Sequence, residues 1–188
     1  MNENEQLRPN LDAACLLVID MQEYFREIAK PILKNVQVLL KEARSRGVKI
    51  IYTQHGHNNP EVDGGMLGKW WNDHVLTHSP TWKILPEVQP RSTELIVHKK
   101  RYSAFITSSS SIDLENHLRE EGIDTIIICG VMTNLCCETN ARDAFNRDFQ
   151  VFFLSDGTAT SASEYQEATL MNMKYGFATL LSCNHVFE

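Results

Sequence analysis

The stretch that decides the fold is Thr125-Ile126-Ile127-Ile128-Cys129-Gly130, which runs on into Val131-Met132-Thr133-Asn134-Leu135-Cys136-Cys137-Glu138. Its first five residues are apolar and rich in β-branched side chains, which predicts a strand buried on both faces. Gly130 interrupts this strand, and Thr133 or Asn134 is placed to cap a following helix. The apolar positions of that helix recur at helical spacing, at Cys137, Ala141, Ala144 and Phe145.

Cys136 is therefore expected in the first turn of a helix that leaves the carboxyl end of a central strand. Unpaired backbone N–H groups and the positive end of the helix dipole both favour a thiolate at this position. Ligands of open α/β sheets also bind at the carboxyl edge of the strands. Cys136 is accordingly our candidate nucleophile.

The remainder of the chain alternates between predicted strands and helices. The predicted strands are 13–20, 48–53, 94–99, 125–129, 150–155 and 177–181. This alternation predicts a doubly wound, mostly parallel six-stranded sheet with helices on both faces, in a single domain that spans residues 1–188. Residues 1–10 are expected to be a loose leader, and the long irregular segment 54–92 a lid over the strand ends.

Two serine-led patterns predict helix starts. Ser110 with Asp113, and Ser161 with Glu164, each resemble a capping box. After the second of these, we expect a final amphipathic helix whose apolar face consists of Tyr165, Ala168, Met171 and Tyr175.

Composition narrows the class of protein. The chain has 188 residues and a formal net charge of −6, and it contains no basic stripe that would neutralise phosphates, so we expect no nucleic-acid partner. It contains no apolar run of the roughly 20 residues needed to cross a bilayer, and no apolar signal segment near Met1, so we expect no membrane association. The five cysteines are odd in number and mostly lie in apolar stretches, which fits a reducing cytoplasm.

Three strand ends bring reactive side chains to the same rim: Asp20, either Lys99 or Lys100, and Cys136. Asp20 can accept the thiol proton and later pass it to a leaving group. A nearby lysine would position the aspartate and favour its ionised form. The backbone N–H groups of Met132 and Cys136 are our candidates for binding the oxyanion of a tetrahedral intermediate.

Three ordered motifs resemble those of the isochorismatase-like cysteine hydrolases, the superfamily that includes nicotinamidases. They are Leu17-Val18-Ile19-Asp20-Met21-Gln22, Lys99-Lys100-Arg101-Tyr102-Ser103-Ala104-Phe105, and the segment from Gly130 to Glu138. The resemblance selects Lys99 as the catalytic lysine and Cys136 as the nucleophile. It also implies a cis peptide bond between Val131 and Met132, and assembly as a homodimer or homotetramer.

The resemblance implies hydrolysis of the C–N bond of a small, nicotinamide-like carboxamide through a thioester. The candidate substrate-binding residues are Phe25, Trp70, Trp71 and Tyr102. One alternative is a vinyl-ether hydrolase of the isochorismatase type, in which a protonated Asp20 supplies a proton to carbon. A second alternative is a non-catalytic binding module on the same scaffold.

We predict no cofactor and no bound metal. Metal-containing nicotinamidases carry Asp-x-His at the end of the second strand, whereas this chain has His55-Gly56-His57. Together with His74, these residues provide three imidazoles, which is a sufficient number to bind zinc in principle. We nevertheless expect them to be locally hydrogen-bonded side chains.

Overall fold

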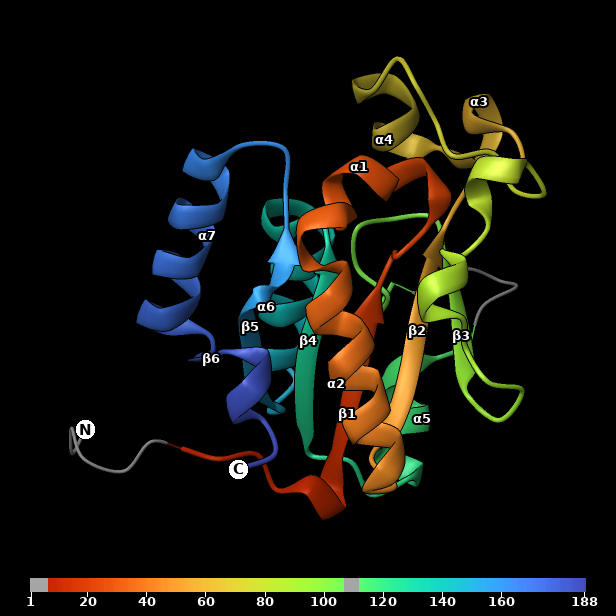
Figure 1. Ribbon diagram of the computed structural model, residues 1–188. Helices are drawn as coiled ribbons and strands as arrows, with labels where there is room; N and C mark the ends of the chain where they lie inside the picture. Colours follow the sequence, from red (N-terminus) through yellow and green to blue (C-terminus); the bar gives the residue numbers. More distant parts are fainter. Residues whose placement is uncertain (1–6, 107–111) are drawn as a thin grey trace.

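The computed structural model describes residues 7–106 and 112–188. In this part of the chain six strands form one all-parallel sheet in the order β3-β2-β1-β4-β5-β6 (Figure 1). Their bounds are β1 Ala14–Ile19, β2 Lys49–His55, β3 Leu95–Lys99, β4 Thr125–Val131, β5 Gln150–Ala159 and β6 Thr179–Leu181. The predicted doubly wound α/β fold is thereby confirmed.

Helices cover both faces of the sheet (Figure 1). Their bounds are α1 Arg26–Ala29, α2 Leu33–Ser45, α3 Pro60–Asp63, α4 Gly65–Trp70, α5 Leu114–Glu120, α6 Glu138–Phe145 and α7 Ser163–Gly176. One core packs α2, through Val36, Leu39 and Leu40, against strand residues such as Leu16 and Phe152. The other core packs α5, α6 and α7 against the alternate residues of the same strands, as expected when successive side chains of a strand point to opposite faces.

The strand register brings the carboxyl ends of β1, β2, β3 and β4 together. Ile19 lies opposite Thr53 on one side and Gly130 on the other, and His55 lies opposite Lys99. Because all the strands are parallel, the residues that follow β1, β2, β3 and β4 meet at one edge of the sheet.

The turn after the central strand differs from the expected one. β4 continues through Val131, and Thr133–Cys137 form a π-helical turn before α6 begins. Met132 is its N-cap and makes no side-chain capping bond, so the predicted cap by Thr133 or Asn134 is wrong. These two side chains contact other elements instead, because the Thr133 hydroxyl donates to Gln166 and Asn134 accepts a hydrogen bond from Thr160.

The predicted orientation of α7 is also wrong. Its N-cap is Ala162 rather than Ser161, with no side-chain capping bond, and its buried residues are Thr169 and Met173. The expected apolar face of Tyr165, Ala168, Met171 and Tyr175 is exposed instead. Phe145 of α6, which was also expected inside, is 47% exposed and packs edge-on against Phe177.

The predicted lid segment 54–92 is more ordered than expected. β2 extends to His55, and the segment contains α3, α4 and two short 3₁₀ turns, Pro80–Trp82 and Pro86–Val88. Asp113 caps α5 by accepting a hydrogen bond from the backbone N–H of Asn116. Ser110, its expected partner in a capping box, lies outside the described residues.

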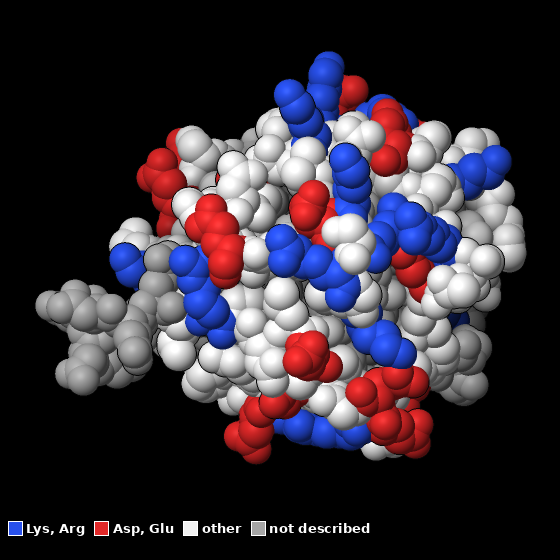
Figure 2. Space-filling model, turned by 60° about the horizontal axis from the view of Figure 1, so that its bottom comes forward, with Lys and Arg blue, Asp and Glu red and all other residues white. Residues whose placement is uncertain are grey.

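Charges of both signs are interspersed on the face seen in Figure 2, with no large field of one sign. Within residues 7–106 and 112–188, no helix is both long and apolar enough to cross a membrane.

Gly130 provides a test of how closely β4 and β1 must approach. A Cβ atom at this position would lie 2.1 Å from the carbonyl oxygen of Ile19, and φ is +120°, a value that L-residues rarely adopt. We expect Gly130→Ala to lower the free energy of unfolding by at least about 3 kcal/mol, measured by urea denaturation.

The matched control is Gly47→Ala, at a φ of +71° with no atom within 4 Å of the added methyl group. Here only the backbone cost of about 1–2 kcal/mol applies. Equal losses in the two variants would show that the contact with Ile19 is unimportant.

Candidate active site

Asp20, Lys99 and Cys136 meet at the carboxyl edge of the sheet. The Lys99 Nζ atom lies 2.6 Å from Asp20 Oδ2 and 3.4 Å from Cys136 Sγ. The three residues are 0%, 2% and 6% exposed, respectively. The ammonium therefore bridges a carboxylate and a thiol in a site that is almost closed to water.

Asp20 is held by the neighbouring strand. Its backbone is in the left-handed region, with φ 48°, which turns the residue out of β1. Its N–H donates to Thr53 Oγ1 over 3.2 Å, and the Thr53 hydroxyl donates to Asp20 Oδ1 over 2.6 Å. One oxygen of the carboxylate thus binds Thr53 while the other faces Lys99. The sequence analysis did not identify Thr53, because a threonine in a strand carries no signal of such a role.

Cys136 is held through its backbone by Asn140. The Asn140 Nδ2 atom donates to Cys136 O over 2.7 Å and to Tyr102 O over 3.0 Å, and its Oδ1 accepts from Ala104 N over 2.9 Å. This buried amide ties the nucleophile turn to the loop that follows Lys99. The only sequence signal is a polar residue between the apolar positions of α6, and the sequence analysis missed it.

The pKa of Cys136 does not favour the thiolate that we expected from the sequence. Burial raises the pKa of Cys136 to about 12, although Lys99 acts to lower it, so the sulfur holds its proton at neutral pH. Burial also acts to lower the pKa of Lys99, but Asp20 and Cys136 outweigh it and raise that pKa, so the lysine remains an ammonium. In this π-helical turn, burial outweighs the effect of Lys99 on the pKa of Cys136.

The candidate substrate-binding residues occupy different places. Trp71 Nε1 donates to the hydroxyl of Tyr102 over 2.8 Å, which joins the α4 end of the lid to the loop after Lys99. Phe25 is half-buried against the core beside α2 and packs edge-on against Tyr24, at 4.9 Å between ring centroids. Trp70, at the end of α4, is mostly exposed. The pair of Trp71 and Tyr102 thus lies next to the reactive residues, while Trp70 faces solvent.

The histidines lie at the end of β2 beside the same rim. The rings of His55 and His57 are 5.0 Å apart between centroids, and those of His57 and His74 are 6.2 Å apart. His57 Nδ1 lies 3.3 Å from Asp63 Oδ1, and Asp63 Oδ2 lies 3.1 Å from the Lys100 ammonium. Neither ring nitrogen of the buried His57 has a hydrogen-bond partner among the described residues, so our expectation of local hydrogen bonds fails for this residue.

These side chains do not present a ready set of metal ligands. Across residues 7–106 and 112–188, no three His, Cys, Asp or Glu side chains are grouped so as to hold a metal ion. Asp63, whose carboxylate lies beside His57, is paired with the Lys100 ammonium, which disfavours a dication there. The absence of a metal remains a prediction, and elemental analysis of the purified protein tests it.

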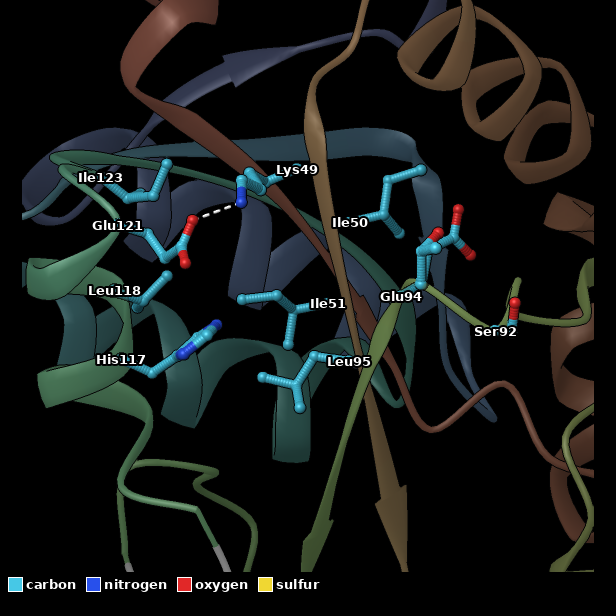
Figure 3. Close-up of a pocket in the computed structure, with 11 residues that line it drawn as sticks. Lys49, Ile50, Ile51, Ser92, Glu94, Leu95, His117, Leu118, Glu121 and Ile123 are labelled. Carbon is cyan, nitrogen blue, oxygen red and sulfur yellow. Dashed lines mark hydrogen bonds and ion pairs between the residues drawn. The ribbon is translucent and has the colours of Figure 1, made fainter.

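Two cavities lie on opposite sides of the strand pair β2 and β3. One, of about 240 Å³, reaches Lys99 and Lys100 from the side and is walled by Trp82 and His98. The other, of about 380 Å³, is lined by Ile51, Leu95 and Leu118 (Figure 3). Polar residues at its border include Lys49, the first residue of β2, and Glu121, which form an ion pair. The second cavity lies toward the amino ends of the strands. It is therefore separate from the opposite edge of the sheet, where Asp20, Lys99 and Cys136 meet.

Comparison with known proteins identifies the family. The Isochorismatase domain family matches residues 14–185, and the chain therefore belongs to the isochorismatase family of hydrolases. It is 44% identical over 185 residues to Nicotinamidase 3 of Arabidopsis thaliana, covering 97% of this chain and 91% of that protein. It is 31% identical over 170 residues to the isochorismatase of Bacillus subtilis, covering 86% of this chain and 53% of that one.

The same conclusion follows from solved structures. A cysteine hydrolase from Pseudomonas syringae pv. phaseolicola superposes with a TM-score of 0.89 at 29% sequence identity, covering 99% of this chain and 97% of that one. The predicted resemblance to isochorismatase-like cysteine hydrolases is thus confirmed.

His55 makes stability depend on pH. Burial lowers its pKa from 6.5 to about 3, so the folded protein keeps this imidazole neutral where the unfolded chain binds a proton. Stability should therefore fall as the pH drops from about 6.5 to about 3, by up to roughly 1.4 kcal/mol per pH unit from this residue. We expect His55→Gln to flatten that slope in urea denaturation measured across the range. Parallel pH curves for the two proteins would contradict this assignment.

Asn140 offers a separate test of the nucleophile turn. Asn140→Ala leaves the Ala104 N–H and two carbonyl groups without their partner in a buried place, at about 1–3 kcal/mol for each unsatisfied group. We expect a clear fall in the urea midpoint. Asn146→Ala on the exposed end of the same helix is the control and should change stability by less than about 0.5 kcal/mol. Similar values for both would argue against a special role for Asn140.

Proposed function

We propose that this protein is a cysteine amidase that hydrolyses a small carboxamide through a thioester on Cys136. The observation that carries the proposal is the Lys99 ammonium in contact with both Asp20 and Cys136 in a buried site. A thiol, a carboxylate within reach of its proton and a fixed cation are the groups that acyl transfer to sulfur requires. The identity of 44% to a protein named Nicotinamidase 3 supports an amide as substrate.

In the first half of the reaction, the Cys136 proton moves to Asp20 as the sulfur attacks the carboxamide carbon. Lys99 stabilises the separated charges, because it lies within 3.4 Å of the sulfur and 2.6 Å of the carboxylate. The oxyanion accepts hydrogen bonds from the backbone N–H groups of Met132 and Cys136. Asp20 then gives the proton to the departing nitrogen, the C–N bond breaks, and ammonia leaves a thioester behind.

In the second half, a water molecule attacks the thioester carbon. Asp20 takes a proton from this water, and the C–S bond breaks to release the carboxylic acid. The proton returns to the sulfur, which restores the thiol of the resting state. The raised pKa of Cys136 fits this cycle, since the proton is present at its start and at its end.

The aromatic groups beside the triad support a planar substrate. Tyr102 lies in the loop that follows Lys99 and accepts a hydrogen bond from Trp71, and Phe25 is the last residue of the 3₁₀ turn Glu23–Phe25 that follows β1. A flat ring, as in nicotinamide, matches such walls. Trp70 is proposed to contact the substrate only at the outer rim, since it is mostly exposed.

The decisive assay measures ammonia released from nicotinamide and a panel of small carboxamides. We expect release by the wild type and a loss of at least about a thousandfold in Cys136→Ala. Cys15→Ala, which removes a buried thiol at the far end of β1, should retain activity. Rapid quenching followed by mass spectrometry should find the acyl group on the peptide that contains Cys136.

Two other outcomes would overturn the proposal. If wild type releases no ammonia but forms pyruvate from isochorismate, and Cys136→Ala still does so, the protein is a vinyl-ether hydrolase. If neither substrate class is turned over, the protein is a binding module that keeps the scaffold.

A further inference from the structure

α7 contacts the segment that carries the candidate nucleophile through two polar side chains. Thr133 is the first residue of the π-helical turn 133–137, and its hydroxyl donates to Gln166 Oε1 over 2.5 Å. Glu138 follows this turn as the first residue of α6, and its Oε2 atom accepts from Thr169 Oγ1 over 2.8 Å. Gln166 and Thr169 are three positions apart, so they lie on one side of α7. The helix therefore binds both ends of the turn.

Gln166 also binds an irregular part of β5. The register between β4 and β5 shifts after Ile128, and the residues of β5 that precede Thr158 form a bulge. A bulge takes backbone groups out of the regular ladder, and these groups need other partners. The amide nitrogen of Gln166 donates to Ser155 O over 3.3 Å and to Thr158 O over 3.2 Å. One side chain thus joins the bulge of β5 to the π-helical turn, with its donors on one and its acceptor on the other.

The residue that Gln166 holds is adjacent to a group of the oxyanion site. Thr133 is 0% exposed and directly follows Met132. The Met132 carbonyl accepts from the backbone N–H groups of Leu135 and Cys137, each over 3.1 Å. Because Met132 and Thr133 share a peptide unit, an anchored Thr133 side chain restricts rotation of the backbone beside the Met132 N–H. Donors to an oxyanion are effective when their direction is fixed before the reaction.

We propose that Gln166 is a positioning residue that acts through Thr133 to fix the Met132 N–H toward the oxyanion. This inference rests on the proposed function, since the oxyanion forms when Cys136 attacks a carbonyl carbon. Within the described part of the chain, the hydrogen bonds of Gln166 go to the π-helical turn and to β5. Its effect on the reaction therefore depends on the Thr133 hydroxyl, and the contacts with β5 keep the acceptor of that hydroxyl in place.

An aldehyde measures the oxyanion site without turnover. When pyridine-3-carbaldehyde adds to the Cys136 thiol, a C–S bond forms, the carbonyl π bond breaks and the thiol proton passes to the oxygen. The adduct is tetrahedral, and its oxygen takes the place of the oxyanion. We expect Gln166→Met and Thr133→Val, which remove the hydrogen bond and nearly keep the side-chain size, each to raise the dissociation constant of this adduct about tenfold. KM for nicotinamide should change by less than about threefold, because the bond matters for the tetrahedral state.

Three comparisons separate positioning from a loss of stability. Thr133→Ser keeps the hydroxyl and should bind the aldehyde like the wild type. The double variant of Gln166→Met with Thr133→Val should bind no more weakly than the weaker single variant, because both substitutions remove the same bond. Asn172→Ala is the matched control, since this exposed amide on α7 donates to the Ala168 carbonyl of its own helix, and it should leave the dissociation constant unchanged. Circular dichroism verifies that each variant is folded.

The outcomes distinguish this inference from the proposed function. Aldehyde affinities of Gln166→Met and Thr133→Val equal to that of the wild type would overturn the inference, as would additive effects in the double variant or a Thr133→Ser variant as weak as Thr133→Val. A wild type that forms the adduct on Cys136 but releases no ammonia would contradict the amidase alone, because the variants still report on the oxyanion site. A wild type that forms no adduct would overturn both.

Discussion

The buried ion pair between Lys99 and Asp20 is the constraint on which the rest of the site depends. Taking an ammonium and a carboxylate out of water costs several kcal/mol for each ion, and only close contact and further hydrogen bonds offset this cost. The protein supplies both, with a separation of 2.6 Å and hydrogen bonds from Thr53 to the carboxylate and from Lys99 to the Arg101 carbonyl. Asp20 follows β1 and Lys99 ends β3, and these are the two strands that flank β2. The ion pair therefore also sets the distance between the carboxyl ends of β1 and β3.

Cys136 is positioned by elements that are far apart in the sequence. Asn140 connects the Cys136 carbonyl to the loop after β3, and Gln166 of α7 binds the hydroxyl of Thr133 in the same turn. The thiol in this frame is protonated at rest, since burial outweighs the effect of Lys99 on its pKa. In the proposed mechanism, proton transfer to Asp20 accompanies attack, so the reaction depends on the geometry of the three side chains as well as on the acidity of the sulfur.

Two relatives of this chain have names that denote different reactions: Nicotinamidase 3 at 44% identity and an isochorismatase at 31%. The family scaffold therefore supports more than one reaction. In this chain the sheet supplies the edge at which Asp20, Lys99 and Cys136 meet, whereas the segment 54–92 supplies side chains beside that edge. In this chain the lid provides His57, His74 and Trp71 around that edge, with Asp63 paired to Lys100.

The sequence by itself determined the strands, their order along the chain and the residues at their carboxyl ends. Buried parallel strands are short, continuous apolar runs, and a polar residue at the end of such a run lies at the sheet edge, which is how Asp20 and the pair Lys99 and Lys100 were identified. Cys136 was identified from the helix predicted after the central strand, and the family resemblance selected Lys99 over Lys100. Only the tertiary structure decided how they are held. Thr53 and Asn140 act through contacts between residues 33 and 36 positions apart, which no local pattern encodes. The exposed apolar face of α7 has the same cause: helical spacing shows that four residues share a face, but the polar contacts of Gln166 and Thr169 with the neighbouring turn decided that this face points away from the core.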